Sequence, residues 1–361
     1  MVLYAAFNRG ADGDARHILQ GHEGTIRAIA VSHDGAYAAS ASGDHTVRIW
    51  KLHSFECVAV CASETQELLT GTHGERLSVG RGHGGVVTNI AWSPRSDRLM
   101  SVGMDKVIRI WDLSGALIGL IEGHGHAILA CDWAFHGREL ATAGSSGELR
   151  FWELQDTEKD WTTIARSDPL VWQFAVAPHS GVHTHTHDGV SLRTRAASPQ
   201  HSGSIGALKY AHNSTHIATV CMAGEIRVWK ISPECEGSNE RDSCVSVSAN
   251  VAKALVSCAW NIDDTRLAVG SETGVCILYD VENHNMAPTL LKIFNLPNGY
   301  VSSVTLLPQN LSPHTAEFAR ADYLVCAGAG NTPTVFNCQT LRKHTPLSGI
   351  QVLGPAAVGI G

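Results

Sequence analysis

Residues 21–52 read GHEGTIRAIAVSHDGAYAASASGDHTVRIWKL. The segment begins with a Gly-His pair and ends with an Asp followed by Ile-Trp, and two runs of alternating apolar residues lie between them. Because side chains on a β-strand alternate between the two faces of a sheet, each run predicts one strand. His33-Asp34-Gly35 predicts the turn between these strands. The segment therefore predicts a unit of three strands joined by tight turns.

The same unit recurs along the chain. A spacing of 28 residues separates His22 from Trp50, His83 from Trp111 and His124 from Trp152. A fixed spacing of this kind indicates a repeat architecture rather than a series of unrelated domains.

In the first two copies a serine and an aspartate also keep their places, which gives the sets His22, Ser40, Asp44, Trp50 and His83, Ser101, Asp105, Trp111. An indole N–H can donate to a hydroxyl, the hydroxyl to an imidazole, and the imidazole to a carboxylate. We interpret both sets as structural hydrogen-bond relays. The later copies lack the serine or the aspartate, so their relays are expected to be eroded and Trp229 to matter less.

These residues resemble the signature of the WD40 family of β-propellers, and Trp111-Asp112 supplies a literal Trp-Asp pair. The resemblance implies an all-β fold in which four-stranded antiparallel blades surround a central channel. We predict one domain over residues 1–361 with seven blades and a loose tail at 342–361. The blades are expected to begin near residues 22, 83, 124, 167, 201, 251 and 297.

Two features of this predicted ring depart from a minimal propeller. The fourth blade is placed over residues 169–194 with Thr194 where a Trp is usual, and its outer strand is expected to be short or absent. Closure is needed because an open ring exposes a strand edge. We expect residues 15–20 to supply the outer strand of the last blade, with residues 351–353 competing for that place. Insertions are predicted at 62–81, 232–244 and 309–322.

Composition limits the function classes. The net charge of −7 and the absence of a long Lys/Arg run disfavour direct nucleic-acid binding. The N-terminal segment lacks the pattern of a secretory signal, and no run approaches the ~18 apolar residues that span a membrane. Ten cysteines without a CxxC motif indicate reduced thiols rather than disulfides or a zinc site. We therefore expect a cytoplasmic or nuclear protein without a cofactor.

Three groups of residues could carry chemistry. His22, Ser40 and Asp44 have the composition of a hydrolase triad, but a serine fixed between an indole and an imidazole faces no cleft. His183, His185 and His187 would share one face of a strand, yet neighbours there stand nearly 7 Å apart by the roughly 3.3 Å rise per residue, which disfavours one tetrahedral metal ion. Asp132 and Lys209 fall at strand positions where other blades carry alanine, and we expect them to face the channel. No enzyme activity is predicted.

The resemblance also implies a functional surface. In the family, the top face around the channel mouth is formed near the start of each inner strand and just before each turn Asp. The first position corresponds here to Arg27, Thr88, Leu129, Trp172, Gly206, Val256 and Ser302. Large side chains anchor interfaces well, and we predict that partners bind Arg27, Met104, Trp172, His187, Met222, Glu272 and Tyr300. The competing interpretation for Trp172 is a core residue.

The predicted function is a non-catalytic scaffold or complex subunit that binds one or more proteins or peptides through the top face and the insertions. Two other hypotheses stay open at this point. One is a propeller metalloenzyme that uses the cluster from His183 to His187, and the other is an RNA-associated scaffold.

Overall fold

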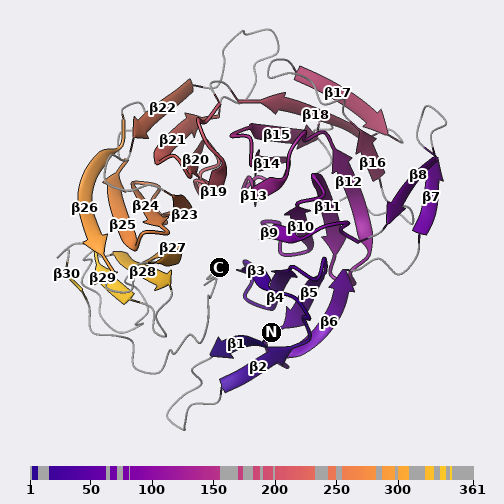
Figure 1. The fold of residues 1–361 in the computed structure, drawn as a ribbon, viewed down its shortest axis with the longest axis horizontal. Coiled ribbons are helices and arrows are strands. Elements are labelled where there is room, and N and C mark those ends of the chain that lie inside the picture. The colour runs from indigo at the N-terminus through magenta and orange to yellow at the C-terminus, as the bar shows by residue number, and fades with distance from the viewer. Residues whose placement is uncertain are drawn as a thin grey trace.

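The computed structural model describes most of the chain, and its strands are arranged in a ring that is open on one side (Figure 1). The described residues are 2–6, 16–61, 66–70, 76–80, 82–154, 170–173, 182–187, 190–197, 200–231, 243–248, 254–281, 287–296, 300–308, 322–328, 334–338 and 342–343. Within these ranges no helix has the length and apolar character needed to cross a bilayer.

Six blades surround the centre of the ring, and each is listed here from its inner to its outer strand. Blade 1 contains β3 (Ile26–Val31), β4 (Tyr37–Ser42), β5 (Val47–Lys51) and β6 (Glu56–Cys61). Blade 2 contains β9 (Val87–Trp92), β10 (Arg98–Gly103), β11 (Val107–Asp112), β12 (Leu117–Glu122) and β16 (Leu170–Gln173). Blade 3 contains β13 (Ile128–Trp133), β14 (Glu139–Gly144), β15 (Leu149–Leu154), β18 (Val190–Ala196) and β17 (Val182–His187).

The other three blades have four strands each. Blade 4 contains β19 (Ile205–Tyr210), β20 (His216–Cys221), β21 (Glu225–Lys230) and β22 (Ser243–Ser248). Blade 5 contains β23 (Leu255–Trp260), β24 (Arg266–Ser271), β25 (Val275–Asp280) and β26 (Thr289–Asn295). Blade 6 contains β27 (Val301–Pro308), β28 (Asp322–Gly328), β29 (Thr334–Asn337) and β30 (Arg342–Lys343).

The hydrophobic cores of the ring lie between successive blades. Trp111 of blade 2 packs with Ile49 of blade 1, and Trp152 of blade 3 packs with Ile110 of blade 2. Trp229 of blade 4 packs in the same way with Phe151 of blade 3. Cores of this kind lie at the five steps from blade 1 to blade 6, and within the described residues none joins blade 6 to blade 1. Because the apolar faces of two sheets are buried against each other at these steps, each blade depends on the neighbours it packs against for stability.

Indole groups at the ends of inner strands add hydrogen bonds between blades. Trp92 Nε1 donates to the carbonyl of Ala30 over 3.1 Å, and Trp133 Nε1 donates to that of Ala91 over 3.0 Å. Trp260 repeats the contact by donating to the carbonyl of Lys209 over 3.0 Å. These bonds fix the position of one inner strand relative to the next.

The propeller class is confirmed, but the predicted number of seven blades is wrong, because the described residues form six. The segment expected to make a separate fourth blade is divided between two sheets. Its first strand, β16, lies parallel to β12 at the outer edge of blade 2. Its other strands form the β17–β18 hairpin, and β18 pairs with β15 as the fourth strand of blade 3. Thr194, expected at the usual place of a Trp, lies opposite Trp152 instead.

The predicted closure by an N-terminal strand is also wrong. The strand β2 (Arg16–Gln20) pairs with β1 (Val2–Ala6) in a two-stranded sheet. The outer position of blade 6 is taken by β30. The insertion after blade 1 contains a second two-stranded sheet, β7 (Gln66–Thr70) with β8 (Arg76–Gly80). Most of the other two insertions, and residues 351–353, lie outside the described residues.

Candidate functional site

A hydrogen-bond relay joins three strands and a turn in blade 1. Trp50 Nε1 donates to Ser40 Oγ over 2.8 Å, and the same hydroxyl lies 2.8 Å from His22 Nε2. On the other side of the imidazole, His22 Nδ1 lies 2.8 Å from Asp44 Oδ2. Blade 2 repeats these contacts at 2.7, 2.7 and 3.0 Å with Trp111, Ser101, His83 and Asp105. Both serines are completely buried, so neither can attack a substrate.

Blades 3 and 4 carry relays that the sequence interpretation missed. Trp152 Nε1 donates to Thr142 Oγ1 over 2.7 Å, and this hydroxyl lies 2.7 Å from His124 Nε2. The carboxylate comes from Glu148, whose Oε2 lies 3.6 Å from His124 Nδ1. In blade 4 the corresponding residues are Trp229, Thr219, His201 and Glu225.

The carboxylate in these two blades stands two residues beyond the place of Asp44. Glu148 directly precedes β15, and Glu225 is the first residue of β21. The extra methylene of Glu lets the carboxylate reach back toward the imidazole. A search for Asp at one fixed position could not find it, whereas a search for either acid at both positions would have.

The four relay histidines make stability dependent on pH. Burial lowers the pKa of His22, His83 and His124 from 6.5, and burial together with Arg227 lowers that of His201 to about 4. Unfolding restores the ordinary pKa, so the unfolded chain binds more protons below pH 6.5. The contribution of the neutral relay histidines to the free energy of unfolding is fully present above pH 6.5. It is lost as the pH falls toward 4.

We therefore expect the urea midpoint of unfolding to fall steadily between pH 7 and pH 4.5. The variant His201→Gln should show a shallower fall because one titrating imidazole is absent. A wild-type midpoint that stays constant down to pH 5 would contradict this account of the relays.

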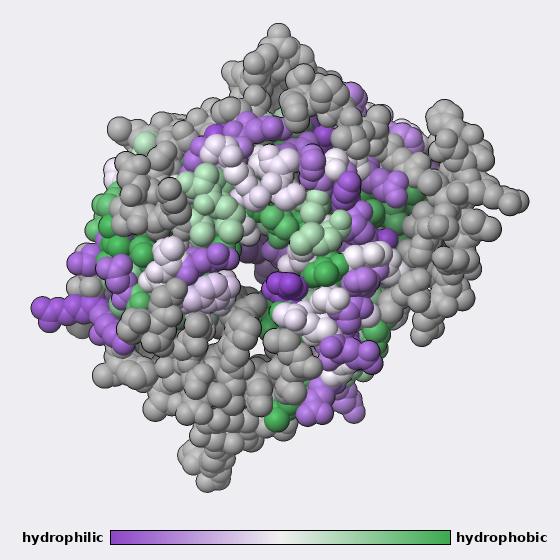
Figure 2. Space-filling view, viewed as in Figure 1, coloured by the Kyte–Doolittle hydropathy of each residue, from purple (hydrophilic) through white to green (hydrophobic). Residues whose placement is uncertain are grey.

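One residue of each inner strand is displaced from regular pairing by a β-bulge. The bulge falls at the same position in all six described blades, and a bulge redirects the side chain of the extra residue. The displaced residues are Arg27, Thr88, Leu129, Gly206, Val256 and Ser302, and all of them line a central cavity of about 650 Å³. The opening of this cavity is visible at the centre of the ring in Figure 2.

Besides the bulge residues, an ion pair also lines the cavity. Lys209 Nζ is 3.0 Å from Asp132 Oδ1, and the other carboxylate oxygen accepts the backbone N–H of Tyr210 over 2.9 Å. Enclosure in the cavity disfavours the charged form of Lys209, although its side chain is 48% exposed, and the Asp132 carboxylate outweighs this and raises the pKa of the ammonium group. Both residues line the cavity, so the pair gives its wall a polar, charged segment.

The top face is the end of the ring that carries the turns between the second and third strands of the blades. Met104 and Met222 stand on these turns with 49% and 39% of their surfaces exposed. Glu272 is exposed on the equivalent turn of blade 5. Arg27 is exposed on its bulge, and Tyr300 is half-buried directly before β27.

Two residues predicted for the top face lie elsewhere. Trp172 is completely buried in β16, where its Nε1 donates to the carbonyl of Val190 over 3.2 Å. This indole holds the edge of blade 2 against blade 3. His187 ends β17, the outermost strand of blade 3. Both were misplaced because their segment was assigned to a separate blade.

Within the part of the chain that the structure describes, the three histidines of β17 are not brought together with other metal ligands. Among the described residues, the one group of His, Cys, Asp or Glu side chains with mutual distances suited to a metal is His201, Cys221 and Glu225. This group lies on blade 4 and was not singled out from the sequence.

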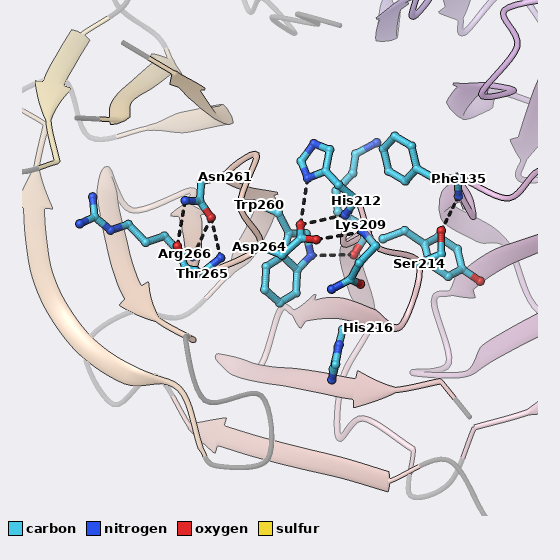
Figure 3. A network of polar contacts seen from close by, with 12 residues as sticks. Phe135, Lys209, His212, Ser214, His216, Trp260, Asn261, Asp264, Thr265 and Arg266 are labelled. Atoms are coloured by element: carbon cyan, nitrogen blue, oxygen red, sulfur yellow. Dashed lines mark hydrogen bonds and ion pairs between the residues drawn. The ribbon is translucent and has the colours of Figure 1, made fainter. Parts of the chain in front are cut away.

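The bottom face, formed by the turns between the first and second strands, carries a cluster that the sequence interpretation did not consider. The Phe135 ring contacts the tilted ring of His212 with centroids 5.1 Å apart, and that of His33 at 5.7 Å. Asp264 accepts from His212 over 2.9 Å, and Ser214 accepts the backbone N–H of Phe135 (Figure 3). Each aromatic residue lies seven positions after the start of its inner strand, so the repeat spacing itself was the available signal.

Four segments of the chain match the family model described as "WD domain, G-beta repeat". The matched residues are 13–51, 74–112, 115–153 and 190–230. Each segment contains the Trp of one relay, so the matches coincide with the four blades that carry relays. Blades 5 and 6 contain no matched segment.

Three curated relatives are similar to parts of the chain. Protein HIR1 of Kluyveromyces lactis is 31% identical over 91 residues, 25% of this chain. Striatin-4 of Homo sapiens is 29% identical over 116 residues, 32% of the chain. The probable cytosolic iron-sulfur protein assembly protein 1 of Neurospora crassa is 34% identical over 120 residues, 27% of the chain. The chain spans only 10%, 14% and 22% of the lengths of these relatives, respectively.

Proposed function

We propose, from the premise that this chain is a WD40-repeat protein, that it is a non-catalytic scaffold or complex subunit whose top face binds a protein partner. The repeat class supports a role in protein interactions. The observation that carries the proposal is the exposure of Met104 and Met222 on the turns of blades 2 and 4.

Methionine side chains at these positions suit a binding surface. They are flexible and polarizable, so they adapt to the shape of an apolar partner group. A residue at the tip of a turn gains little from being apolar unless something covers it, and interface cores are enriched in Met and Arg. Arg27, at the cavity mouth of blade 1, supplies a cation that can pair with an acidic partner group.

The backbone beneath these side chains is fixed. Met104 N donates to the carbonyl of Val86 over 2.9 Å, and Met222 N donates to that of Ser204 over 2.9 Å. Each turn is therefore tied to the segment that leads into its blade. A partner that binds here pays little to order the protein backbone, because the surface is already organised.

The proposal predicts a specific loss of binding when Arg27, Met104 and Met222 are changed together to alanine. Affinity purification with mass spectrometry should recover the specific partners at least tenfold less well, since anchor residues carry most of the binding free energy. The matched control is the bottom-face pair Phe135→Ala and Ile262→Ala, which should leave recovery unchanged. An unchanged partner list with the triple variant, at unchanged melting temperature, would refute the top-face proposal.

A cytoplasmic or nuclear location and a single domain over residues 1–361 belong to the same proposal. One relative carries "cytosolic" in its name, which is compatible with that location. We propose proteins or peptides as the partners.

A further inference from the structure

Three potential metal ligands meet at the top of blade 4. Their ligand atoms all lie within 4.8 Å of one another. They are His201 before β19, Cys221 at the end of β20, and Glu225 at the start of β21. His201 and Cys221 are buried, whereas the carboxylate of Glu225 is partly exposed to the top face.

The relay orients the imidazole of His201 so that its Nδ1 faces the Glu225 carboxylate. His201 Nε2 lies 2.7 Å from Thr219 Oγ1, which also accepts from Trp229. His201 Nδ1 is completely buried and has no hydrogen-bond partner, although it lies 3.3 Å from Glu225 Oε2. Metal-binding histidines characteristically use their second nitrogen in this way, because that bond fixes the ring and the tautomer.

The carboxylate is oriented as well. Its contacts with Arg227, with the backbone N–H of Ser202 and with His201 all fall on Oε2. A metal ion between the two residues would replace the contact of Oε2 with His201 Nδ1. Arg227, whose Nη2 lies 3.1 Å from Oε2, holds the carboxylate in place but also brings a positive charge near the ion.

The other relays show that the relay itself does not need the cysteine. Blade 3 has the same arrangement with His124 and Glu148, and Gly144 stands where blade 4 has Cys221. Blade 1 has Ser42 at this position. Within the described residues only blade 4 combines the unpartnered imidazole nitrogen with a thiol and a carboxylate.

We propose that His201 Nδ1, Cys221 Sγ and Glu225 bind one zinc ion. A set of one nitrogen, one sulfur and one oxygen ligand suits Zn²⁺, whose bonds to these atoms are about 2.0 to 2.3 Å long. The separation of 3.3 Å between His201 Nδ1 and Glu225 Oε2 matches two corners of such a tetrahedron. The thiol of Cys221 gives its proton to water as the sulfur–zinc bond forms. The fourth position faces the exposed side of Glu225 and is open to water or to a partner group.

The test is titration of the purified full-length chain, freed of metal by a chelator, with Co²⁺ and then Zn²⁺. A thiolate bound to Co²⁺ gives a charge-transfer absorption band in the near ultraviolet. We expect one Co²⁺ per chain with this band, and its loss when Zn²⁺ is added. The variant Cys221→Ser should lack the band and bind Zn²⁺ at least tenfold more weakly, whereas Cys57→Ser, which removes an exposed thiol, should behave like wild type.

Serine is a natural residue at this position in blade 1, so Cys221→Ser is expected to fold. Its melting temperature without metal serves as the check. If it does not fold, Glu225→Gln is the second variant, and it should weaken Zn²⁺ binding at least tenfold. The proposal is overturned if the wild type shows no band, if the band survives in Cys221→Ser, or if it is lost in Cys57→Ser.

Discussion

The variants Trp152→Ala and Trp229→Ala are each expected to lower the free energy of unfolding by about 3–5 kcal/mol, the cost of deleting a fully buried Trp. Both indoles are completely or almost completely buried, and each packs against the preceding blade. Each also donates to a buried threonine hydroxyl. Removing the ring therefore leaves a cavity between two sheets and a hydroxyl without its donor.

Trp229→Ala should cost as much as Trp111→Ala, within about 1 kcal/mol. The sequence suggested a smaller effect because blade 4 lacks the usual Asp, but Glu225 takes its place in the relay. The measurement is urea unfolding followed by circular dichroism. The matched variant Trp229→Phe keeps most of the ring volume while it removes the N–H donor, so it should cost less than half as much. A much smaller loss for Trp229→Ala than for Trp111→Ala would show that the blade 4 relay contributes little.

The variant Glu139→Ala should also cost about 3–5 kcal/mol, because removing one partner of a buried ion pair leaves an unpaired buried charge. Glu139 is buried in β14, where its Oε2 lies 2.9 Å from Arg195 Nη1 and its Oε1 accepts from the Tyr210 hydroxyl over 2.6 Å. The carboxylate thus joins blade 3 to blade 4 and to the added strand β18. Arg195 also lies over the ring of Phe151 at 4.5 Å.

The control for this prediction is Glu153→Ala. Glu153 lies directly opposite Glu139 in the register of blade 3 but is only half-buried, so its loss should cost under about 1 kcal/mol. Tyr210→Phe should fall between the two, since it removes one hydrogen bond and leaves the ion pair. Equal effects of Glu139→Ala and Glu153→Ala in urea unfolding would contradict a role of the buried pair in holding the blades together.

The repeat spacing predicted the propeller class because 28 residues from His to Trp correspond to one set of strands, whatever the loops contain. It could not predict the number of blades. An alternating pattern specifies a strand and its buried face but not the sheet that the strand joins. The hairpin of β17 and β18 has the pattern of an independent blade. In the structure, however, β18 pairs with the edge of β15 and extends blade 3.

The positions around the cavity were easier to predict than the chemistry at the site. Arg27 and its equivalents line the cavity because a bulge recurs at one repeat position. The group of His201, Cys221 and Glu225 escaped notice because its members come from three segments, and no short motif joins them. Proximity of this kind arises only when the strands have paired.

Because of the recurring bulge, the residues that set the strand register differ from those that face the cavity. A displaced residue takes no part in the strand register, so natural variation there can change the recognition surface without changing the fold. The six positions carry side chains as different as those of Arg27, Leu129 and Ser302. Gly206 is the exception, because a Cβ atom there would collide with the carbonyl oxygen of Leu255. Thr88 and Ser302 are also tied to the scaffold, because their hydroxyls donate to the carbonyls of Ile128 and Ala327. The recognition surface can therefore change most freely at Arg27, Leu129 and Val256.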